Sequence, residues 1–210
     1  MTRVLVLCDD YWHPGETVRD GLKPLSEQGW EFDIVDDASA WSLESMASYP
    51  VTVLAKSDDV TAEDRSSWAD EAMQQAFVSY VEGGAGLLAL HSGTCYAEMP
   101  ALRALIGGAF DHHPKQCPVT VEATNGNAVC EGFEPFTAID EHYHMLLDDA
   151  AADVFLTATS EHGSQPAGWT RSQGQGRVCV LTPGHNLDVF LQPGMQTLMA
   201  NALRWCLGSA

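Results

Sequence analysis

The sequence Gly86-Leu-Leu-Ala-Leu-His-Ser-Gly93 joins a short apolar run to a turn of small residues. Short apolar runs bounded by turn residues are typical of strands buried inside a parallel sheet. In open α/β sheets, ligands bind beyond the carboxyl ends of such strands. The sequence therefore predicts an α/β fold whose functional edge carries His91 and Ser92. A cysteine or the Gly-x-Ser-x-Gly turn of common hydrolases does not occur at this position.

Strand-like and helix-like segments alternate on both sides of this stretch. The alternation predicts a doubly wound, mostly parallel sheet with helices on both faces. Residues 110–149 have irregular spacing and are expected to form excursions over the sheet edge. The expected strands are 3–8, 31–35, 51–56, 87–90, 118–122, 154–159 and 177–181. The expected helices are 17–28, 61–82, 100–106 and 195–207.

The composition is that of a globular and strongly acidic chain. The 210 residues are 45% hydrophobic, and because no linker-like cluster or internal repeat interrupts them, we expect a single domain over 1–210. The 29 acidic residues outnumber the 10 basic ones and give a formal net charge of −19. Such a surface repels phosphate backbones and anionic lipids, so we expect neither nucleic-acid nor membrane binding. Solubility or a salt-adapted source is the simpler explanation of this charge.

The sequence also indicates a cytoplasmic protein. The apolar part of the first ten residues is too short for a signal peptide, and Asp9 and Asp10 interrupt it. No apolar run approaches the roughly 20 residues of a membrane span. The six cysteines form no Cys-x-x-Cys pair, and several lie inside apolar patterns. We therefore expect them to be reduced and mostly buried.

The histidines follow the ends of the expected strands. His13 follows the first strand, His91 ends the central one and His185 follows the strand over 177–181. If these strands are parallel, the three histidines meet at one edge. A surface or capping role is the alternative for any one of them. His112 or His113 and Glu141 are plausible additions from the irregular region, whereas His162 is expected to lie in a surface loop. Four aromatic residues could stack on a sugar or simply anchor loops: Tyr11, Trp12, Tyr143 and Trp169.

Three chemistries are compatible with such a cluster. Imidazole and carboxylate ligands suit zinc or another divalent ion, with His91, His113 and His185 as candidate ligands, although no compact metal-binding spacing is present. General acid–base catalysis would use His91 or His185 for proton transfer and Glu141 as an orienting group. A Ser92–His185 nucleophilic pair is the third, but the first glycine of the usual strained serine turn is missing.

Several motifs, taken in order, resemble the ThuA-like (trehalose-utilisation) family. The resemblance spans almost the whole chain, and its specificity comes from the order and spacing of the motifs. It implies a flavodoxin-like fold related to the class I glutamine amidotransferases. The motifs are Gly84–Gly93, Phe110–Pro114, Asp140-Glu141 with Tyr143, Pro166–Trp169, Gly176-Arg177, Gly184-His185 and Asn201–Trp205.

The resemblance also implies that the glutaminase chemistry of the amidotransferases is lost. His91 occupies the position of their catalytic cysteine, and Cys95, four residues later, is a poor substitute. His185 lies near the position of their histidine, but Asn186-Leu187 replaces the usual Pro-Glu. A Gly-x-Gly-x-x-Gly fingerprint is absent from the chain, which argues against a self-contained NAD-dependent dehydrogenase.

What the resemblance implies for function is the processing of an oxidised (3-keto) sugar or glycoside in trehalose and disaccharide utilisation, by a lyase or hydrolase type of reaction. The alternative is a non-catalytic domain that binds a sugar or a protein, and homo-oligomers are compatible with either. The expected catalytic residues are His91, His185 and Glu141. The expected substrate-binding residues are Asp9, His13, Ser92, His113, Tyr143 and Trp169.

Overall fold

The computed structural model describes residues 1–150 and 152–208; residues 151 and 209–210 of the expected domain 1–210 lie outside this description. Its strands are β1 Thr2–Cys8, β2 Trp30–Val35, β3 Val51–Ala55, β4 Gly86–Leu90, β5 Gly108–His112, β6 Cys117–Ala123, β7 Phe136–Asp140, β8 His144–Leu147, β9 Asp153–Ser160, β10 Gly163–Gln173 and β11 Gly176–Leu181. Its α-helices are α1 Gly15–Leu22, α2 Leu43–Met46, α3 Glu71–Glu82, α4 Pro100–Ile106, α5 Leu187–Phe190 and α6 Pro193–Cys206.

Nine strands of the described chain form one sheet, in the order β2-β1-β3-β4-β11-β10-β9-β6-β7. The first five are parallel neighbours, and their order is that of flavodoxin-like sheets. Antiparallel pairs extend the sheet beyond β11, so that within the described sheet only β10 and β6 run against the other strands. The predicted α/β fold with a mostly parallel sheet is therefore confirmed.

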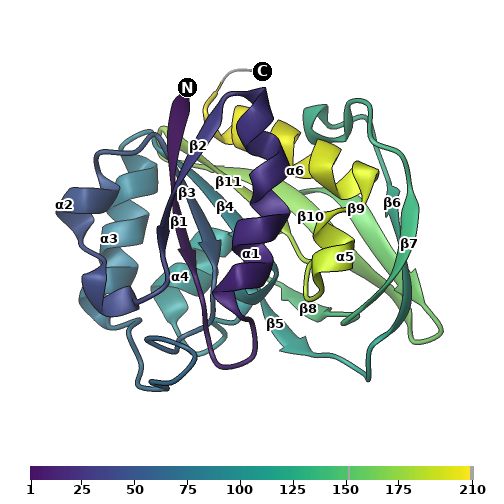
Figure 1. Ribbon diagram of the computed structural model, residues 1–210, viewed down its shortest axis with the longest axis horizontal. Helices are drawn as coiled ribbons and strands as arrows, with labels where there is room; N and C mark the ends of the chain where they lie inside the picture. Colours follow the sequence, from purple (N-terminus) through teal and green to yellow (C-terminus); the bar gives the residue numbers. More distant parts are fainter. Residues whose placement is uncertain (151, 209–210) are drawn as a thin grey trace.

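Helices cover both faces of this sheet (Figure 1), with α1, α5 and α6 on one side and α2, α3 and α4 on the other. The alternation along β1 explains the two cores. Val4 and Val6 pack with the α1 and α6 side, whereas Leu5 and Leu7 pack with the α2–α4 side. Because successive side chains of a strand point to opposite faces, a strand buried on both sides must be apolar throughout. This accounts for the continuous apolar runs in the sequence.

Two expected helices differ from the structure. The helix expected over 17–28 is α1 followed by a 3-10 segment, Lys23–Gln28, because Pro24 lacks the N–H that a regular α-helix needs. The helix expected over 61–82 begins only at Glu71. Asp70 caps it by accepting a hydrogen bond from the Met73 N–H, and residues 61–70 form a loop beside the sheet edge.

The region expected to be irregular contains four strands. β6 and β7 join the main sheet, and β5 and β8 form a separate two-stranded sheet. In Figure 1, β5 and β8 lie below the parallel strands, on the side toward which their carboxyl ends open, and β6 and β7 lie at the far edge of the main sheet. The six cysteines are free. In the described ranges, no helix is long and apolar enough to cross a membrane.

Candidate functional site

Three histidines from separate loops meet at the carboxyl edge of the parallel strands. His13 follows β1, His91 directly follows β4 and His185 follows β11. Their ring centroids are 5.0 Å apart for His13–His91, 5.2 Å for His13–His185 and 5.6 Å for His91–His185. The structure thus brings together the three histidines that the strand pattern placed at one edge.

Glu141 lies at the centre of this cluster. It follows β7, the strand at the far edge of the antiparallel extension. Its Oε2 lies 3.1 Å from His185 Nδ1 and 3.5 Å from His91 Nε2, and its Oε1 lies 3.6 Å from His113 Nε2. One carboxylate from a remote part of the sheet therefore faces three imidazoles.

The turn that carries His91 has an unusual backbone. His91 has a φ of 43°, in the left-handed region that residues other than glycine rarely occupy. Gly93 packs so closely against β3 that a Cβ would overlap the Leu54 carbonyl oxygen. The left-handed backbone of His91 costs about 1–3 kcal/mol in strain, and strain of this kind is typical of functional sites. The turn resembles a nucleophile-bearing turn in shape, with an imidazole at its tip.

Backbone and carboxylate groups hold the three histidines in place. His91 Nδ1 lies 2.8 Å from the Thr182 carbonyl oxygen, and His13 Nδ1 lies 2.7 Å from Asp10 Oδ1. The buried Asp140 carboxylate accepts the backbone N–H groups of Gly184 and His185, each at 2.9 Å. Sequence reasoning missed Asp10 and Asp140. Their only signal in the sequence was adjacency to a candidate site residue: Asp10 directly follows Asp9, and Asp140 directly precedes Glu141.

These contacts and burial shift the pKa values of the cluster in different directions. Burial lowers the pKa of His91, so its imidazole is neutral at physiological pH. The Glu141 carboxylate raises the pKa of His185. Burial opposes ionisation of Glu141, but the contact with His185 outweighs it and lowers the pKa of this carboxyl well below its usual value. Glu141 is therefore an anion among imidazoles.

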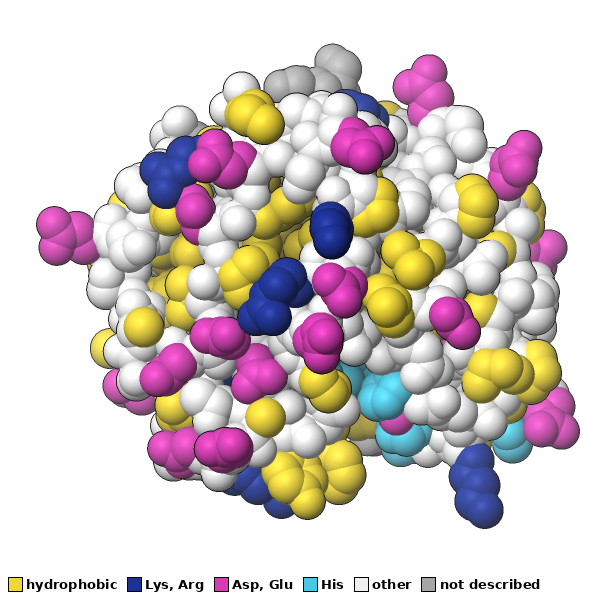
Figure 2. Space-filling model, viewed as in Figure 1, with side chains coloured by type: hydrophobic (Ala, Val, Ile, Leu, Met, Phe, Trp, Pro, Cys, Tyr) yellow, Lys and Arg dark blue, Asp and Glu magenta, His cyan; other side chains and the backbone are white. Residues whose placement is uncertain are grey.

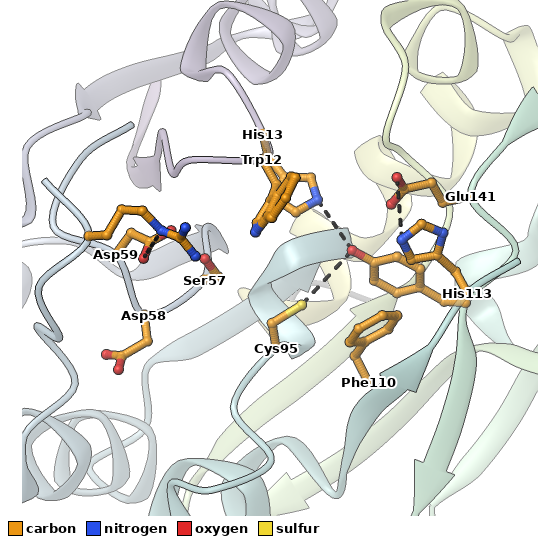
Figure 3. A pocket seen from close by; sticks show the side chains of 11 residues that line it. Trp12, His13, Ser57, Asp58, Asp59, Cys95, Phe110, His113 and Glu141 are labelled. Atoms are coloured by element: carbon orange, nitrogen blue, oxygen red, sulfur yellow. Dashed lines mark hydrogen bonds and ion pairs between the residues drawn. The ribbon is translucent and has the colours of Figure 1, made fainter. Parts of the chain in front are cut away.

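A cavity of about 390 Å³ opens beside the cluster (Figure 3). Its size is within the usual range for small-molecule sites, about 300–1,000 Å³. Tyr143 stacks on His91 with ring centroids 4.0 Å apart, and its hydroxyl lies 3.3 Å from His13 Nε2. The lining residues are Trp12, His13, Ser57, Asp58, Asp59, Arg65, Cys95, Phe110, His113, Glu141 and Tyr143.

The two ends of this cavity differ. Figure 3 shows Glu141 and His113 of the cluster at one end, Asp58 and Asp59 at the other, and Trp12 between them beside His13. Trp12 is 61% exposed, and the Arg65 guanidinium lies 5.8 Å from its ring centroid and 3.8 Å from Asp59 Oδ1. Aromatic and charged side chains thus face a group bound at the cluster.

The expectation that Trp169 contacts a substrate is wrong. Trp169 is fully buried in the core on the α2–α4 side, and its indole N–H donates to the Ile106 carbonyl oxygen at 2.9 Å. Asp9 also has a structural role, because its carboxylate accepts the backbone N–H groups of Gly15 and Ala62. The charged neighbour that reaches the cluster is Asp10, which orients His13.

Ser92 and Cys95 lie close to the cluster. Ser92 lines a small void behind it, together with His13, His91 and His185. Cys95 lines the main cavity, and its Sγ lies 3.9 Å from the Tyr143 hydroxyl. Burial raises the pKa of the Cys95 thiol to about 12. This thiol is therefore protonated at neutral pH.

The residues that could hold a metal ion differ in part from those expected. Ligand-type atoms of His13, His91, Glu141 and His185 all lie within 4.8 Å of one another. His113, which was expected among the ligands, stays outside this group. It contacts the second oxygen of Glu141, and its Nδ1 lies 2.7 Å from the Pro114 carbonyl oxygen.

The family model of ThuA, described as trehalose utilisation, matches residues 3–206. The fold is similar to a putative ThuA-like protein from Parabacteroides merdae, with a TM-score of 0.78, 17% identity and coverage of 98% of this chain and 90% of that one. A putative ThuA-like protein from Bacteroides uniformis gives a TM-score of 0.75 at 22% identity, with coverage of 98% and 91%.

A β-galactosidase from Rahnella sp. R3 contains a region of the same fold. The TM-score is 0.70 at 17% identity, and the match covers 99% of this chain but 32% of the galactosidase. At these identities the solved structures show the fold alone. No curated protein matches the chain.

Proposed function

The chain belongs to the ThuA family of trehalose utilisation, and on this basis we propose that it processes an oxidised (3-keto) sugar or glycoside in disaccharide utilisation. The observation that carries the proposal is the cavity, which has Glu141 and His113 of the cluster at one end and the Trp12 ring beside His13. A carbonyl group bound at the cluster would leave the rest of the sugar beside the aromatic ring. We further propose that the protein acts in the cytoplasm as a single-domain enzyme.

The proposed reaction is an elimination that the keto group makes possible. A carbonyl acidifies the hydrogen on the adjacent carbon. Removal of this proton forms a carbon–carbon double bond as the glycosidic carbon–oxygen bond breaks, and the departing oxygen takes up a proton. The reaction needs no external oxidant or reductant. It needs a site that holds the carbonyl oxygen and one base that receives and returns a proton.

His113 has the geometry for the proton transfer. It lines the cavity, and its side chain is 36% exposed. Its Nδ1 faces the Pro114 carbonyl oxygen, which can only accept a hydrogen bond, so Nδ1 carries a proton, and Nε2, 3.6 Å from Glu141 Oε1, is the ring atom that would exchange a proton with the substrate. The Tyr143 hydroxyl, whose pKa burial raises well above its usual value, lines the cavity and would donate a hydrogen bond to the carbonyl oxygen at the edge of the cluster.

The test is an assay of purified protein with 3-keto-trehalose and with trehalose, followed by NMR. We expect conversion of the keto sugar alone. His113→Asn should lower kcat by about 10²- to 10⁴-fold, the usual contribution of a general base. His112→Asn is the matched control because His112 stacks on His144 and lies outside the cavity lining. Saturable binding of both sugars without turnover would support the binding-domain alternative instead.

A further inference from the structure

Two nitrogen atoms of the cluster are buried without a hydrogen-bond partner. They are His91 Nε2 and His185 Nδ1. Both face Oε2 of Glu141, at 3.5 Å and 3.1 Å, in a geometry that forms no hydrogen bond. An unpaired buried polar atom costs about 1–3 kcal/mol, so native structures keep few of them, and an ion is a common explanation.

The proton positions make the His91–Glu141 contact unfavourable by itself. The Thr182 carbonyl can only accept, so His91 Nδ1 carries the proton and Nε2 presents a lone pair. A lone pair therefore faces a carboxylate oxygen. An ion pair between protonated His185 and Glu141 would explain their 3.1 Å contact. It would not explain the contact between the His91 lone pair and Glu141.

The two distances to Glu141 Oε2 are close to those between ligands of a common ion. Zinc–nitrogen bonds of about 2.0–2.1 Å in a tetrahedral arrangement place neighbouring ligand atoms about 3.3 Å apart. The two distances to Glu141 Oε2, 3.1 Å and 3.5 Å, lie on either side of this value. Ligand-type atoms of all four residues lie within 4.8 Å of one another.

Outer contacts support the same arrangement. Metal-binding histidines usually donate their other ring N–H to a carboxylate or a backbone carbonyl. His13 does so to Asp10, and His91 does so to Thr182. The remaining atom of His13, Nε2, is on the side of Tyr143 and the cavity. Asp140 fixes the backbone of His185.

We propose that His13, His91, His185 and Glu141 bind one divalent transition-metal ion at the end of the cavity. The donors are three imidazole nitrogens and one carboxylate oxygen, a set that suits zinc and its first-row neighbours, whereas magnesium and calcium take oxygen ligands. His13 and Glu141 also line the cavity, so the ion borders the space proposed for the sugar. A bound ion of this kind polarises a carbonyl oxygen. Figure 2 shows histidine side chains gathered in the lower part of the face drawn.

The experiment measures metal content without any substrate. Protein purified without a metal-affinity tag is stripped with EDTA and titrated with Zn²⁺ and with Co²⁺ alone, by calorimetry and by visible absorption. Bound metal is measured by elemental analysis after gel filtration. We expect about one ion per chain and the visible bands of coordinated Co²⁺. Asp10→Asn should bind metal about 10- to 100-fold more weakly, the usual effect of losing an outer partner.

His91→Ala and Glu141→Gln should each abolish stoichiometric metal uptake. Two variants are used so that a folding defect in one of them does not decide the result. His162→Ala is the matched control because His162 is exposed and outside the cluster, so its uptake should equal that of the unmodified protein. The proposal is overturned if the unmodified protein takes up neither ion, or if uptake survives in both His91→Ala and Glu141→Gln. A failure of the sugar assay leaves these readouts unaffected, and so the two proposals fail separately.

Discussion

The carboxylate of Asp140 accepts the backbone N–H of His185 at 2.9 Å, across 45 positions of the sequence. Asp140 ends β7, at the far edge of the antiparallel extension, and His185 follows β11, in the parallel half. The hydrogen bond therefore joins the two halves of the sheet at the cluster. It also fixes the loop that carries His185 beside Glu141, the residue that follows Asp140.

Asp140→Ala is expected to destabilise the protein and to weaken metal retention, although His185 is unchanged. The variant leaves the buried N–H groups of Gly184 and His185 without acceptors, a cost of about 1–3 kcal/mol. Urea denaturation and elemental analysis measure the two effects. Asp111→Ala removes an exposed carboxylate and should change neither. Unchanged metal content in Asp140→Ala would show that the backbone anchor is not needed.

Gly93→Ala is expected to destabilise the turn that carries His91. A Cβ there overlaps the Leu54 carbonyl oxygen, and forcing an extra group into a packed site costs about 1–3 kcal/mol or more. Gly126→Ala is the control, since a Cβ at Gly126 meets nothing within 4 Å. Its free energy of unfolding should stay within about 0.5 kcal/mol of that of the unmodified protein. Equal unfolding midpoints for the two variants in urea would contradict this description of the turn.

Trp169→Phe is expected to reduce stability without changing substrate recognition. The variant removes the N–H that donates to the Ile106 carbonyl oxygen and leaves space in the core. The expected loss in the free energy of unfolding is about 1–3 kcal/mol. KM and kcat should equal those of the unmodified protein at a temperature where both are folded. A raised KM with unchanged stability would show that Trp169 contacts the substrate after all.

Trp12→Ala is expected to raise KM without destabilising the fold. The ring is 61% exposed and lines the cavity, and an aromatic contact worth about 0.5–1.5 kcal/mol corresponds to roughly a twofold to tenfold change in KM. Leu191→Ala, at an exposed apolar position outside the cavity lining, is the control. Steady-state kinetics and a thermal melt distinguish the outcomes. A lower Tm with unchanged KM would assign Trp12 to loop packing.

Cys95 is expected to resist alkylation at pH 8 in the native protein. Because burial raises the pKa of its thiol to about 12, the reactive thiolate is scarce until the pH approaches that value. Mass spectrometry after iodoacetamide treatment measures this, with urea-denatured protein as the reference for full modification. Cys95→Ala should keep turnover within a few-fold. Loss of turnover in that variant would reopen a thiol mechanism.

Local patterns were enough for the parallel half of the sheet and for part of the cluster. The apolar runs of β1, β3, β4 and β11 predicted buried parallel strands, and such strands open on one edge. This rule alone brought His13, His91 and His185 together. The start of α3 was missed because the Asp70 cap was not considered, although residues 61–69 before it are mostly polar. In the irregular region the strand over 118–122 was expected and is β6, whereas β5, β7 and β8 were missed because their pairing is not local.

The sequence by itself determined which strands are buried and, through their parallel direction, which three histidines share an edge. Only the tertiary structure decided what each of them faces. Glu141 reaches the cluster because the antiparallel extension returns β7 to that edge. Trp169 packs on the α2–α4 side, opposite Ala167, because bulges around Gly168 shift the alternation of side chains along β10. Contacts between segments far apart in the chain depend on register and packing, which local periodicity does not encode.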